Sequence, residues 1–336
     1  MKTIVCTKPN EMEIITKEKQ HSIKENEVLI AIKRIGICGT DIHAYGGNQP
    51  FFEYPRVLGH ELSGIVETVG ANVESVKQGN IVTVIPYVNC GKCVACRNGR
   101  ENCCTNMEVI GVHRDGGMTE YLAVPAEHIF VVSDLSLEEA AIVEPLSIGA
   151  HAVRRAEIKE GETVLIVGAG PIGMGAARFA KLAGATTVIM DLSEERLHAC
   201  KEWADCDHAV VAGEAAYQEL LDVNQGELPT VVIDATGNKH SMMSSFDYVS
   251  HSGKLIYVGL VKDTISFFDP DFHAKELTLM ASRNATKEDF NYVIDCLSKG
   301  LVKDSYVTNH IEFDQVPSFF EAGSFTTNKT LIAIDK

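Results

Sequence analysis

Hydrophobic and polar positions follow two different rhythms along the chain. Up to about residue 148, short β-branched runs such as Val28–Ile37, Ile65–Val69 and Ile81–Tyr87 are separated by Gly, Pro and Asn. Such runs are typical of a β-rich region. Over residues 150–284, apolar runs of strand length alternate with segments of helix length. That alternation predicts right-handed βαβ units and a doubly wound parallel sheet, so an α/β chain is expected.

Beyond the alternating region, the chain is predicted to form a helix over about residues 287–299 and a final strand over residues 330–335. Thr286 is expected to cap the helix, with Asp289 three residues further on, and Gly300 is expected to end it. The final strand is predicted to pair with strands of the N-terminal part.

A glycine-rich turn follows the predicted buried strand Thr163–Val167 and precedes a predicted helix. The turn consists of Gly168, Ala169, Gly170, Pro171, Ile172 and Gly173. Glycines at this spacing allow a tight bend, close approach of the backbone to a pyrophosphate and close packing of helix on strand. The helix N-terminus would then present free N–H groups to the phosphates. The sequence therefore predicts a Rossmann dinucleotide site.

The residue that ends the next strand, Asp191, would accept hydrogen bonds from the adenosine ribose hydroxyls. A 2′-phosphate there would meet like charge, so NAD is favoured over NADP. Arg196, about one helical turn further on, weakens this preference. Val258, Gly259 and Ser282 are also assigned to cofactor binding.

Four cysteines form a compact cluster with the spacing C-x2-C-x2-C-x7-C. They are Cys90, Cys93, Cys96 and Cys104. Four thiolates in one lobe, about residues 88–106, suit a closed tetrahedral structural zinc. Cys103 adjoins Cys104 and could replace it. Two disulfides or free thiols are the alternative, against which the tight spacing and a reducing compartment argue.

Composition narrows the class of protein. A chain of 336 residues with 45% hydrophobic and 23% charged residues suits two globular domains. Its net charge of −16 argues against nucleic acid and anionic membranes as partners. No apolar signal core opens the N-terminus, so a cytoplasmic location is expected.

Several short motifs give the chain a family resemblance. Their residues are Cys38-Gly39-Thr40-Asp41-Ile42-His43, Gly59-His60-Glu61, the four cysteines, Glu144-Pro145 and the glycine turn. In this order and spacing, the chain resembles the zinc-containing medium-chain alcohol dehydrogenases over its whole length. The resemblance implies a GroES-like catalytic domain of residues 1–148 and 285–336, a Rossmann domain of residues 149–284, and a homodimer or homotetramer.

The resemblance also implies a catalytic zinc with an open position for the substrate oxygen. Cys38 and His60 would be two of its ligands. Glu144 stands where the ethanol-type members have a cysteine, as in the sorbitol and threonine dehydrogenase branch. Glu61 and Glu144 are then direct or water-mediated ligands, and which of them binds directly is left open. Asp41 would orient His60.

In the implied reaction, the zinc acts as a Lewis acid on the alcohol oxygen, and hydride passes to NAD. The proton would leave through Thr40, the cofactor ribose and His43 to water.

Three stretches, residues 41–61, 109–117 and 282–290, look like those of bacterial dehydrogenases that oxidise the 5-hydroxyl of L-galactonate or L-gulonate. The carboxylate of such a substrate would need a local cation in this acidic chain. Arg283, with Asn284 beside it, is the first candidate, because the family's corresponding stretch lines the cleft near the nicotinamide. His113 and Arg114 form a second pair. An ion pair at Arg283 and a solvated loop at residues 113–114 are the alternatives.

Tyr45 is a further substrate candidate. Sorbitol dehydrogenases carry a tyrosine directly after the relay histidine, whereas here Ala44 intervenes, so a polyol pose does not carry over. Polyol, polyol-phosphate or L-threonine oxidation remain alternatives within the family. A non-catalytic NAD- or zinc-binding protein and a zinc-free reductase are alternatives of other classes, against which the complete set of motif residues argues.

Overall fold

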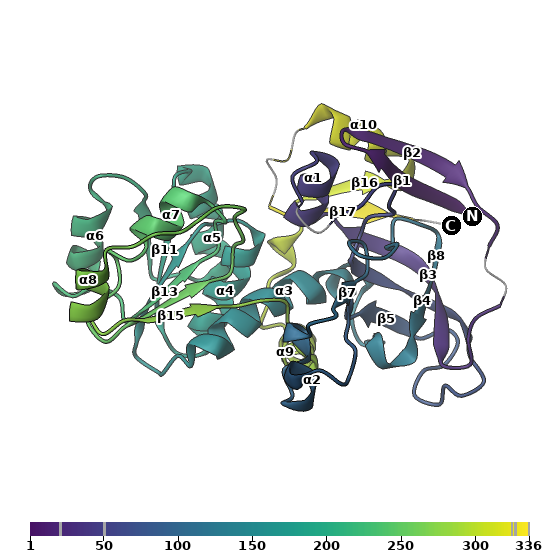
Figure 1. Ribbon diagram of the computed structural model, residues 1–336, viewed down its shortest axis with the longest axis horizontal. Helices are drawn as coiled ribbons and strands as arrows, with labels where there is room; N and C mark the ends of the chain where they lie inside the picture. Colours follow the sequence, from purple (N-terminus) through teal and green to yellow (C-terminus); the bar gives the residue numbers. More distant parts are fainter. Residues whose placement is uncertain (20–21, 50–51, 324, 326–327, 335–336) are drawn as a thin grey trace. The chain divides into compact units, whose positions relative to one another are not determined.

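The computed structural model describes residues 1–19, 22–49, 52–323, 325 and 328–334, and its chain divides into two compact units. The first unit comprises residues 1–144 and 286–336, and the second comprises residues 145–285. Helix α3 (Leu137–Ala156) runs through the boundary between them. Each unit has its own hydrophobic core and is described by itself (Figure 1).

A seven-stranded sheet forms the centre of the first unit. Its strands are β3 (Glu27–Gly36), β4 (Glu61–Val69), β5 (Ile81–Val84), β8 (Tyr121–Pro125), β9 (Ile129–Val131), β16 (Asn309–Glu312) and β17 (Thr330–Ala333). The order is β16-β17-β3-β4-β5-β9, with β8 also paired to β3. Since β17 pairs antiparallel with β3, the end of the chain completes the N-terminal sheet, as expected. Asp335, in the predicted final strand, lies outside the described residues.

Short strands and helices surround this sheet. They are β1 (Lys2–Lys8), β2 (Glu11–Thr16), α1 (Gly39–Tyr45), β6 (Tyr87–Val88), α2 (Val94–Arg97), β7 (Glu108–Val109), α9 (Lys287–Ser298) and α10 (Val316–Ala322). The predicted helix cap is confirmed, because Thr286 and Asp289 form a capping box. Gly300 follows the helix in the left-handed region, with φ of 64°.

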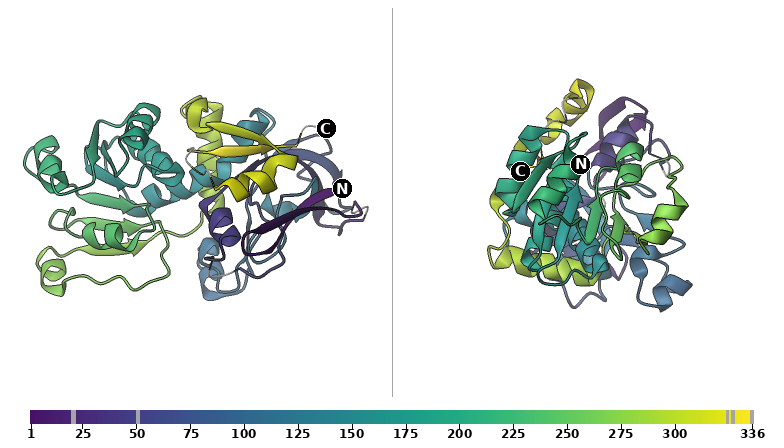
Figure 2. Two further views of the ribbon diagram at one scale, coloured as in Figure 1. Left: turned by 90° about the horizontal axis from the view of Figure 1, so that it is seen from above. Right: turned by 90° about the vertical axis from the view of Figure 1, so that its left-hand side faces the viewer.

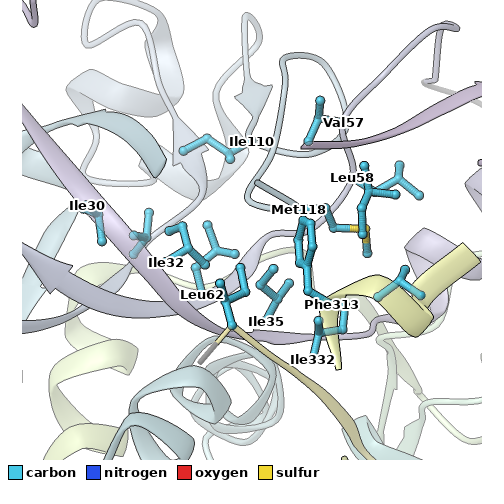
Figure 3. Close-up of a cluster of buried hydrophobic side chains, with 14 of the residues drawn as sticks. Ile30, Ile32, Ile35, Val57, Leu58, Leu62, Ile110, Met118, Phe313 and Ile332 are labelled. Atoms are coloured by element: carbon cyan, nitrogen blue, oxygen red, sulfur yellow. The ribbon is translucent and has the colours of Figure 1, made fainter. Parts of the chain in front are cut away.

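The core of the first unit is built from alternate residues of β3 and its neighbours. Ile30, Ile32 and Ile35 are buried, and an irregularity in the β3–β4 register between Ile32 and Arg34 shifts the alternation by one residue. Figure 3 shows these isoleucines gathered with Leu62 of β4. Full burial of such a side chain contributes about 1.5–3 kcal/mol. Strand β4 begins four residues before the apolar run at Ile65, and its first residues, Glu61, Leu62 and Ser63, are buried as well.

The second unit is a parallel sheet of six strands with helices between them. The strands are β10 (Thr163–Val167), β11 (Thr186–Asp191), β12 (His208–Val211), β13 (Val231–Asp234), β14 (Lys254–Tyr257) and β15 (Thr278–Ala281). The helices are α4 (Pro171–Leu182), α5 (Glu194–Ala204), α6 (Ala216–Val223), α7 (Lys239–Ser244) and α8 (Asp269–Ala274).

The strand order, β12-β11-β10-β13-β14-β15, is that of a doubly wound dinucleotide-binding sheet. Figure 2 shows this sheet from two further sides. The expected fold class, a β-rich GroES-like part plus a Rossmann sheet, is confirmed. Among the described residues, no helix is both long enough and apolar enough to cross a membrane.

Candidate active site and metal centres

One thiol, one imidazole and one carboxylate meet in the first unit. The ligand atoms of Cys38, His60 and Glu61 all lie within 4.8 Å of one another. Local structure places them, since Cys38 is the N-cap of α1, and Glu61 begins β4 directly after His60. Thiolate, imidazole and carboxylate are all donors that zinc accepts, and three protein ligands are the number that a catalytic zinc takes. The residues therefore fit the metal predicted from the sequence.

Asp41 holds the backbone on both sides of this cluster. Its carboxylate accepts the N–H of Cys38 at 2.9 Å and the N–H of Gly59 at 3.2 Å. The Nδ1 atom of His60 lies 3.8 Å from Asp41 Oδ1, and it is buried without a hydrogen-bond partner among the described residues. Asp41 thus faces the ring of His60, on the side where an orienting carboxylate is expected, at a distance longer than a hydrogen bond.

Glu61 is paired with a buried lysine that the sequence reasoning missed. Lys329 Nζ donates to both carboxylate oxygens of Glu61 at 2.7 Å and to the carbonyl of Ile37 at 3.2 Å, so its three protons are all engaged. Burial opposes the charged form of Lys329, but the charges of Glu61 and Cys38 outweigh it and raise its pKa. Lys329 lies 268 residues from Glu61 in the sequence, and no local pattern announces the pair.

Gly36 leaves the space that the Glu61 carboxylate occupies. The two residues are paired across β3 and β4, and a Cβ at position 36 would lie 1.8 Å from Glu61 Oε2. An alanine at position 36 would therefore displace the carboxylate from the cluster.

Glu144 lies in α3 and is held by a different partner. It is buried, and the hydroxyl of Tyr87 donates a hydrogen bond to its Oε1. Burial and the neighbouring charge of Glu61 raise the pKa of Glu144 to about 7, although His60 and Tyr87 act in the opposite direction. Tyr87 is itself buried, with its ring edge-to-face against Phe290. The sequence reasoning missed Tyr87 as well.

A divalent cation would offset much of the negative charge of this centre. With Cys38 as thiolate, the groups Cys38, Asp41, Glu61 and Glu144 carry up to four negative charges, and Lys329 supplies one positive charge. The carboxylates of Asp41, Glu61 and Glu144 are all buried, and buried anions are costly without further compensation. The donor chemistry therefore favours a bound Zn²⁺ at Cys38, His60 and one of the two glutamates.

The two relay candidates lie on α1, directly after Cys38. Thr40 is half-buried and His43 is exposed, and their spacing of three residues puts them on one face of the helix. Tyr45, at the end of the same helix, is engaged elsewhere. Its hydroxyl donates to the carbonyl of Asn10, and its ring packs edge-to-face on Phe320.

The four predicted cysteines form a second centre. Cys90, Cys93, Cys96 and Cys104 have their sulfurs within 4.8 Å of one another, while Cys103 is exposed and outside the cluster. The Cys93 and Cys96 sulfurs are 3.4 Å apart, so they are not joined by a disulfide. Backbone N–H groups of Cys90 and Asn106 donate to the Cys104 sulfur. Backbone hydrogen bonds from Cys96 and Thr105 lower the pKa of Cys93 to about 5. The geometry suits a closed, four-thiolate zinc site.

The glycine turn of the second unit has the geometry predicted for it. Gly168 has φ of 100°, and Gly170 is the N-cap of α4. A Cβ at Gly173 would lie 1.7 Å from the carbonyl oxygen of Gly168, whereas a Cβ at Gly170 would meet nothing within 4 Å. Close packing of helix on strand therefore requires glycine at position 173. Gly170 borders open space, where the pyrophosphate of a dinucleotide could approach the protein backbone closely.

Asp191 closes the same turn. Its carboxylate accepts the N–H of Ala169 at 2.7 Å and the N–H of Ser193 at 2.9 Å. Arg196 is exposed on the first turn of α5. The structure thus places Asp191 at the end of β11 beside the glycines, where a ribose partner is expected.

The other cofactor and substrate candidates of the second unit lie at strand ends. Val258 and Gly259 follow β14 and donate to the carbonyl of Asp234. Ser282 is buried, and its hydroxyl has no hydrogen-bond partner among the described residues. Arg283 is exposed, and Asn284 has a positive φ of 54°.

His113 and Arg114 lie apart from the metal cluster, in the wall of a cavity of the first unit. None of Cys38, His60, Glu61 and Glu144 lines that cavity. His113 accepts the N–H of Val109 on Nδ1. The structure therefore does not bring this second cationic pair to the zinc ligands.

Comparisons with known proteins identify the family. Residues 24–134 match the alcohol dehydrogenase GroES-like domain, and residues 171–299 match the zinc-binding dehydrogenase family. The chain is 46% identical over 323 residues to the L-galactonate-5-dehydrogenase of Escherichia coli K12, covering 96% of this chain and 94% of that protein.

Two solved structures are also similar. The RspB alcohol dehydrogenase of Escherichia coli CFT073, solved with NADH, has 33% identity and a TM-score of 0.92, with 99% of each chain covered. The L-idonate 5-dehydrogenase of Escherichia coli K-12 has 26% identity and a TM-score of 0.89, with 99% of this chain and 98% of that chain covered.

Proposed function

The chain belongs to the zinc-binding alcohol dehydrogenase family and is an NAD-linked oxidoreductase, and from this premise we propose that it oxidises the C5 hydroxyl of L-galactonate or L-gulonate to a 5-keto sugar acid. The observation that carries the proposal is the 46% identity to an L-galactonate-5-dehydrogenase over nearly the whole of both chains. An assembly of two or four copies is part of the same proposal.

In this proposal Cys38, His60 and Glu61 hold the catalytic metal, because their ligand atoms already lie within 4.8 Å of one another. Zn²⁺ supplies a Lewis acid for the substrate hydroxyl, which lowers the pKa of that hydroxyl. Lys329 neutralises Glu61 without taking it out of reach of the cluster, since each carboxylate oxygen keeps a second lone pair. Glu144, whose carboxylate accepts a hydrogen bond from the Tyr87 hydroxyl, is the alternative carboxylate ligand.

The residues of α1 handle the proton. Thr40 is half-buried close to Cys38 in sequence, and His43 is exposed on the same helix face, so their hydroxyl and imidazole lead from the cluster toward solvent. A histidine titrates near neutral pH and can release the proton to water.

The second unit serves the cofactor. The glycine turn with Asp191 would hold the pyrophosphate and ribose of NAD, which would supply the hydride acceptor. Arg283 would pair with the carboxylate of the sugar acid, because a chain of net charge −16 needs a local cation for an anionic substrate.

The proposal is tested by a screen of NAD reduction at mildly alkaline pH. L-galactonate and L-gulonate are compared with sorbitol and L-threonine, and the zinc content of the same protein is measured. Turnover of an L-hexonate with near two zincs per chain supports the proposal. No turnover of an L-hexonate contradicts the proposed substrate, and good turnover of sorbitol or threonine in the same screen would assign the enzyme to that substrate class instead.

A further inference from the structure

The cavity lined by His113 and Arg114 lies in the first unit and has a polar wall. It has a volume of about 400 Å³, which is within the range of small-molecule sites. Its charged lining consists of Lys17, Arg56, Arg114 and Asp115, with the Thr3 and Thr119 side chains beside them. We call it the Arg56 cavity. None of the residues assigned above to zinc or to the dinucleotide lines it.

The cations of the Arg56 cavity outnumber its carboxylate. Lys17 Nζ is 3.9 Å from Asp115 and Arg56 is 3.8 Å from it, so one carboxylate faces two cations. Arg114 is 3.9 Å from Glu108. All three distances exceed that of a hydrogen bond, so these carboxylates do not hold the cations in hydrogen-bonded pairs. In a chain of net charge −16, a local excess of positive charge is unexpected.

Arg56 provides the most specific observation. Its side chain is only 19% exposed, and its Nε is buried with no hydrogen-bond partner among the described residues. The Nη1 of the same guanidinium is 3.8 Å from Asp115, and Arg56 lines the cavity. The planar fork of an arginine suits an oxyanion bound there.

The wall around Arg56 is rigid. Arg56 exchanges both backbone hydrogen bonds with Cys6, at 2.8 and 3.0 Å. The next residue, Val57, donates its N–H to the Asp115 carboxylate. The N–H groups of Gly116 and Met118 donate to the carbonyls of Val57 and Leu58, respectively. Figure 3 shows Val57, Leu58 and Met118 gathered in the core. The cations are therefore presented by fixed backbone rather than by a loose loop.

We propose that the Arg56 cavity binds a small dianion, a phosphate ester or a dicarboxylate, at a site separate from the zinc cluster. The two guanidinium groups and one ammonium carry three positive charges against the two negative charges of Asp115 and Glu108, and together they offer donors to both ends of such a ligand. The binding segment continues directly into His60, four residues after Arg56. Binding at this site does not depend on which hydroxyl the enzyme oxidises.

The test uses the full chain loaded with zinc and NAD, so that the glycine turn is occupied. Binding of inorganic phosphate, glucose 6-phosphate and malate is measured by calorimetry at low ionic strength, against chloride of equal ionic strength. Tighter binding of the phosphates identifies a phosphate site, and tighter binding of malate identifies a dicarboxylate site. Arg56→Gln and Arg114→Gln are expected to weaken the bound anion at least about tenfold each.

Lys299→Gln removes one exposed charge from the same unit and is the matched control, expected to leave the affinity unchanged. Arg114→Gln keeps the test valid if Arg56→Gln does not fold, because the Arg114 side chain is partly exposed and its ion pair with Glu108 is long, at 3.9 Å. Affinity for every probe no better than for chloride overturns the proposal. So does binding that is unchanged in Arg114→Gln, which would place the anion at the zinc or elsewhere on the surface.

Discussion

Two long-range contacts decide the chemistry of the zinc cluster at the scale of single residues. Lys329 pairs with Glu61 across 268 residues of sequence, and Tyr87 bonds Glu144 across 57 residues. The metal donors Cys38 and His60 could be assigned through the family resemblance, because each of the motifs that carry it is a short local stretch. Their partners could not, since a lysine before a strand and a tyrosine in an apolar run carry no sign of what they face.

The Lys329–Glu61 pair yields a prediction about zinc. Lys329→Met would leave the buried carboxylate of Glu61 without a cation. In the zinc-free protein, this loss should lower the free energy of unfolding by about 3–5 kcal/mol. With zinc bound, the metal compensates Glu61 and the loss should be smaller. Unfolding by denaturant, with zinc and after chelation, measures both values.

Lys299→Met, which breaks an exposed pair on α9, is the control and should change neither value appreciably. An equal loss with and without zinc would show that Glu61 does not face the metal.

The Tyr87 hydroxyl yields a second prediction. Tyr87→Phe removes the donor to a buried carboxylate, and about 1–3 kcal/mol of unfolding free energy should be lost. Zinc affinity should also change, because groups that orient metal ligands typically affect it about 10- to 100-fold. Tyr45→Phe, which removes a hydroxyl bonded to the Asn10 carbonyl near the surface, is the matched control. Zinc affinity equal to that of the wild type in Tyr87→Phe would exclude a role for Glu144 at the metal.

At the scale of elements, the cysteine lobe and the glycine turn follow closely from the sequence. Both are short loops whose residues are neighbours in the chain, so spacing alone fixes most of their geometry. The start of β4 and the edge strand β15 were harder to predict. Glu61 interrupts the apolar pattern where β4 begins, and three of the four residues of β15 are exposed, so neither strand shows a continuous buried run in the sequence.

The cysteine lobe is predicted to be structural. Cys93→Ala should reduce the zinc content from about two to about one per chain and lower stability, because the closed site has no position for a substrate. Elemental analysis and thermal unfolding measure the two effects. Cys103→Ala, at an exposed thiol outside the cluster, should change neither. A Cys93→Ala protein that kept its stability and lost only turnover would contradict this role.

The turn at Asp191 is predicted to set cofactor choice. Asp191→Ala should reduce the preference for NAD over NADP, since both the ribose acceptor and the repulsion of a 2′-phosphate are lost. Asp191→Asn removes the charge but keeps one oxygen that can accept a hydrogen bond from the N–H of Ala169 or of Ser193. Comparing the two variants therefore separates the charge repulsion of a 2′-phosphate from the hydrogen bonds that hold the turn. The ratio of kcat/KM for the two cofactors is the readout. A ratio that neither variant changes would mean that Asp191 does not meet the ribose.

For the whole molecule, the sequence predicts the two kinds of sheet but not the substrate. The alternation of strands and helices leads to the order β12-β11-β10-β13-β14-β15, because right-handed crossovers leave few other arrangements. Substrate choice depends instead on a few side chains brought together from distant segments. The structure illustrates this at His113 and Arg114, which lie at the Arg56 cavity rather than at the zinc ligands.

Arg283 is predicted to recognise the substrate carboxylate. Loss of one partner of a desolvated charge pair costs about 2–5 kcal/mol, so Arg283→Ala should lower kcat/KM for L-hexonates about 30- to 5000-fold. A neutral polyol, if it is turned over, should be affected less. Lys262→Ala, at an exposed lysine of the same unit, is the control. Equal losses on acid and polyol would assign Arg283 to the cofactor or the fold.

The central claim is that hydride leaves C5 of a sugar acid for NAD. L-galactonate carrying deuterium at C5 tests this most directly, with the nicotinamide product and the sugar product both analysed by NMR. We predict that the deuterium appears on the reduced nicotinamide ring and that the sugar product is the 5-keto acid. Deuterium retained in a sugar acid that has been oxidised at another carbon would contradict the account, as would L-galactonate left unreacted by the zinc-loaded protein.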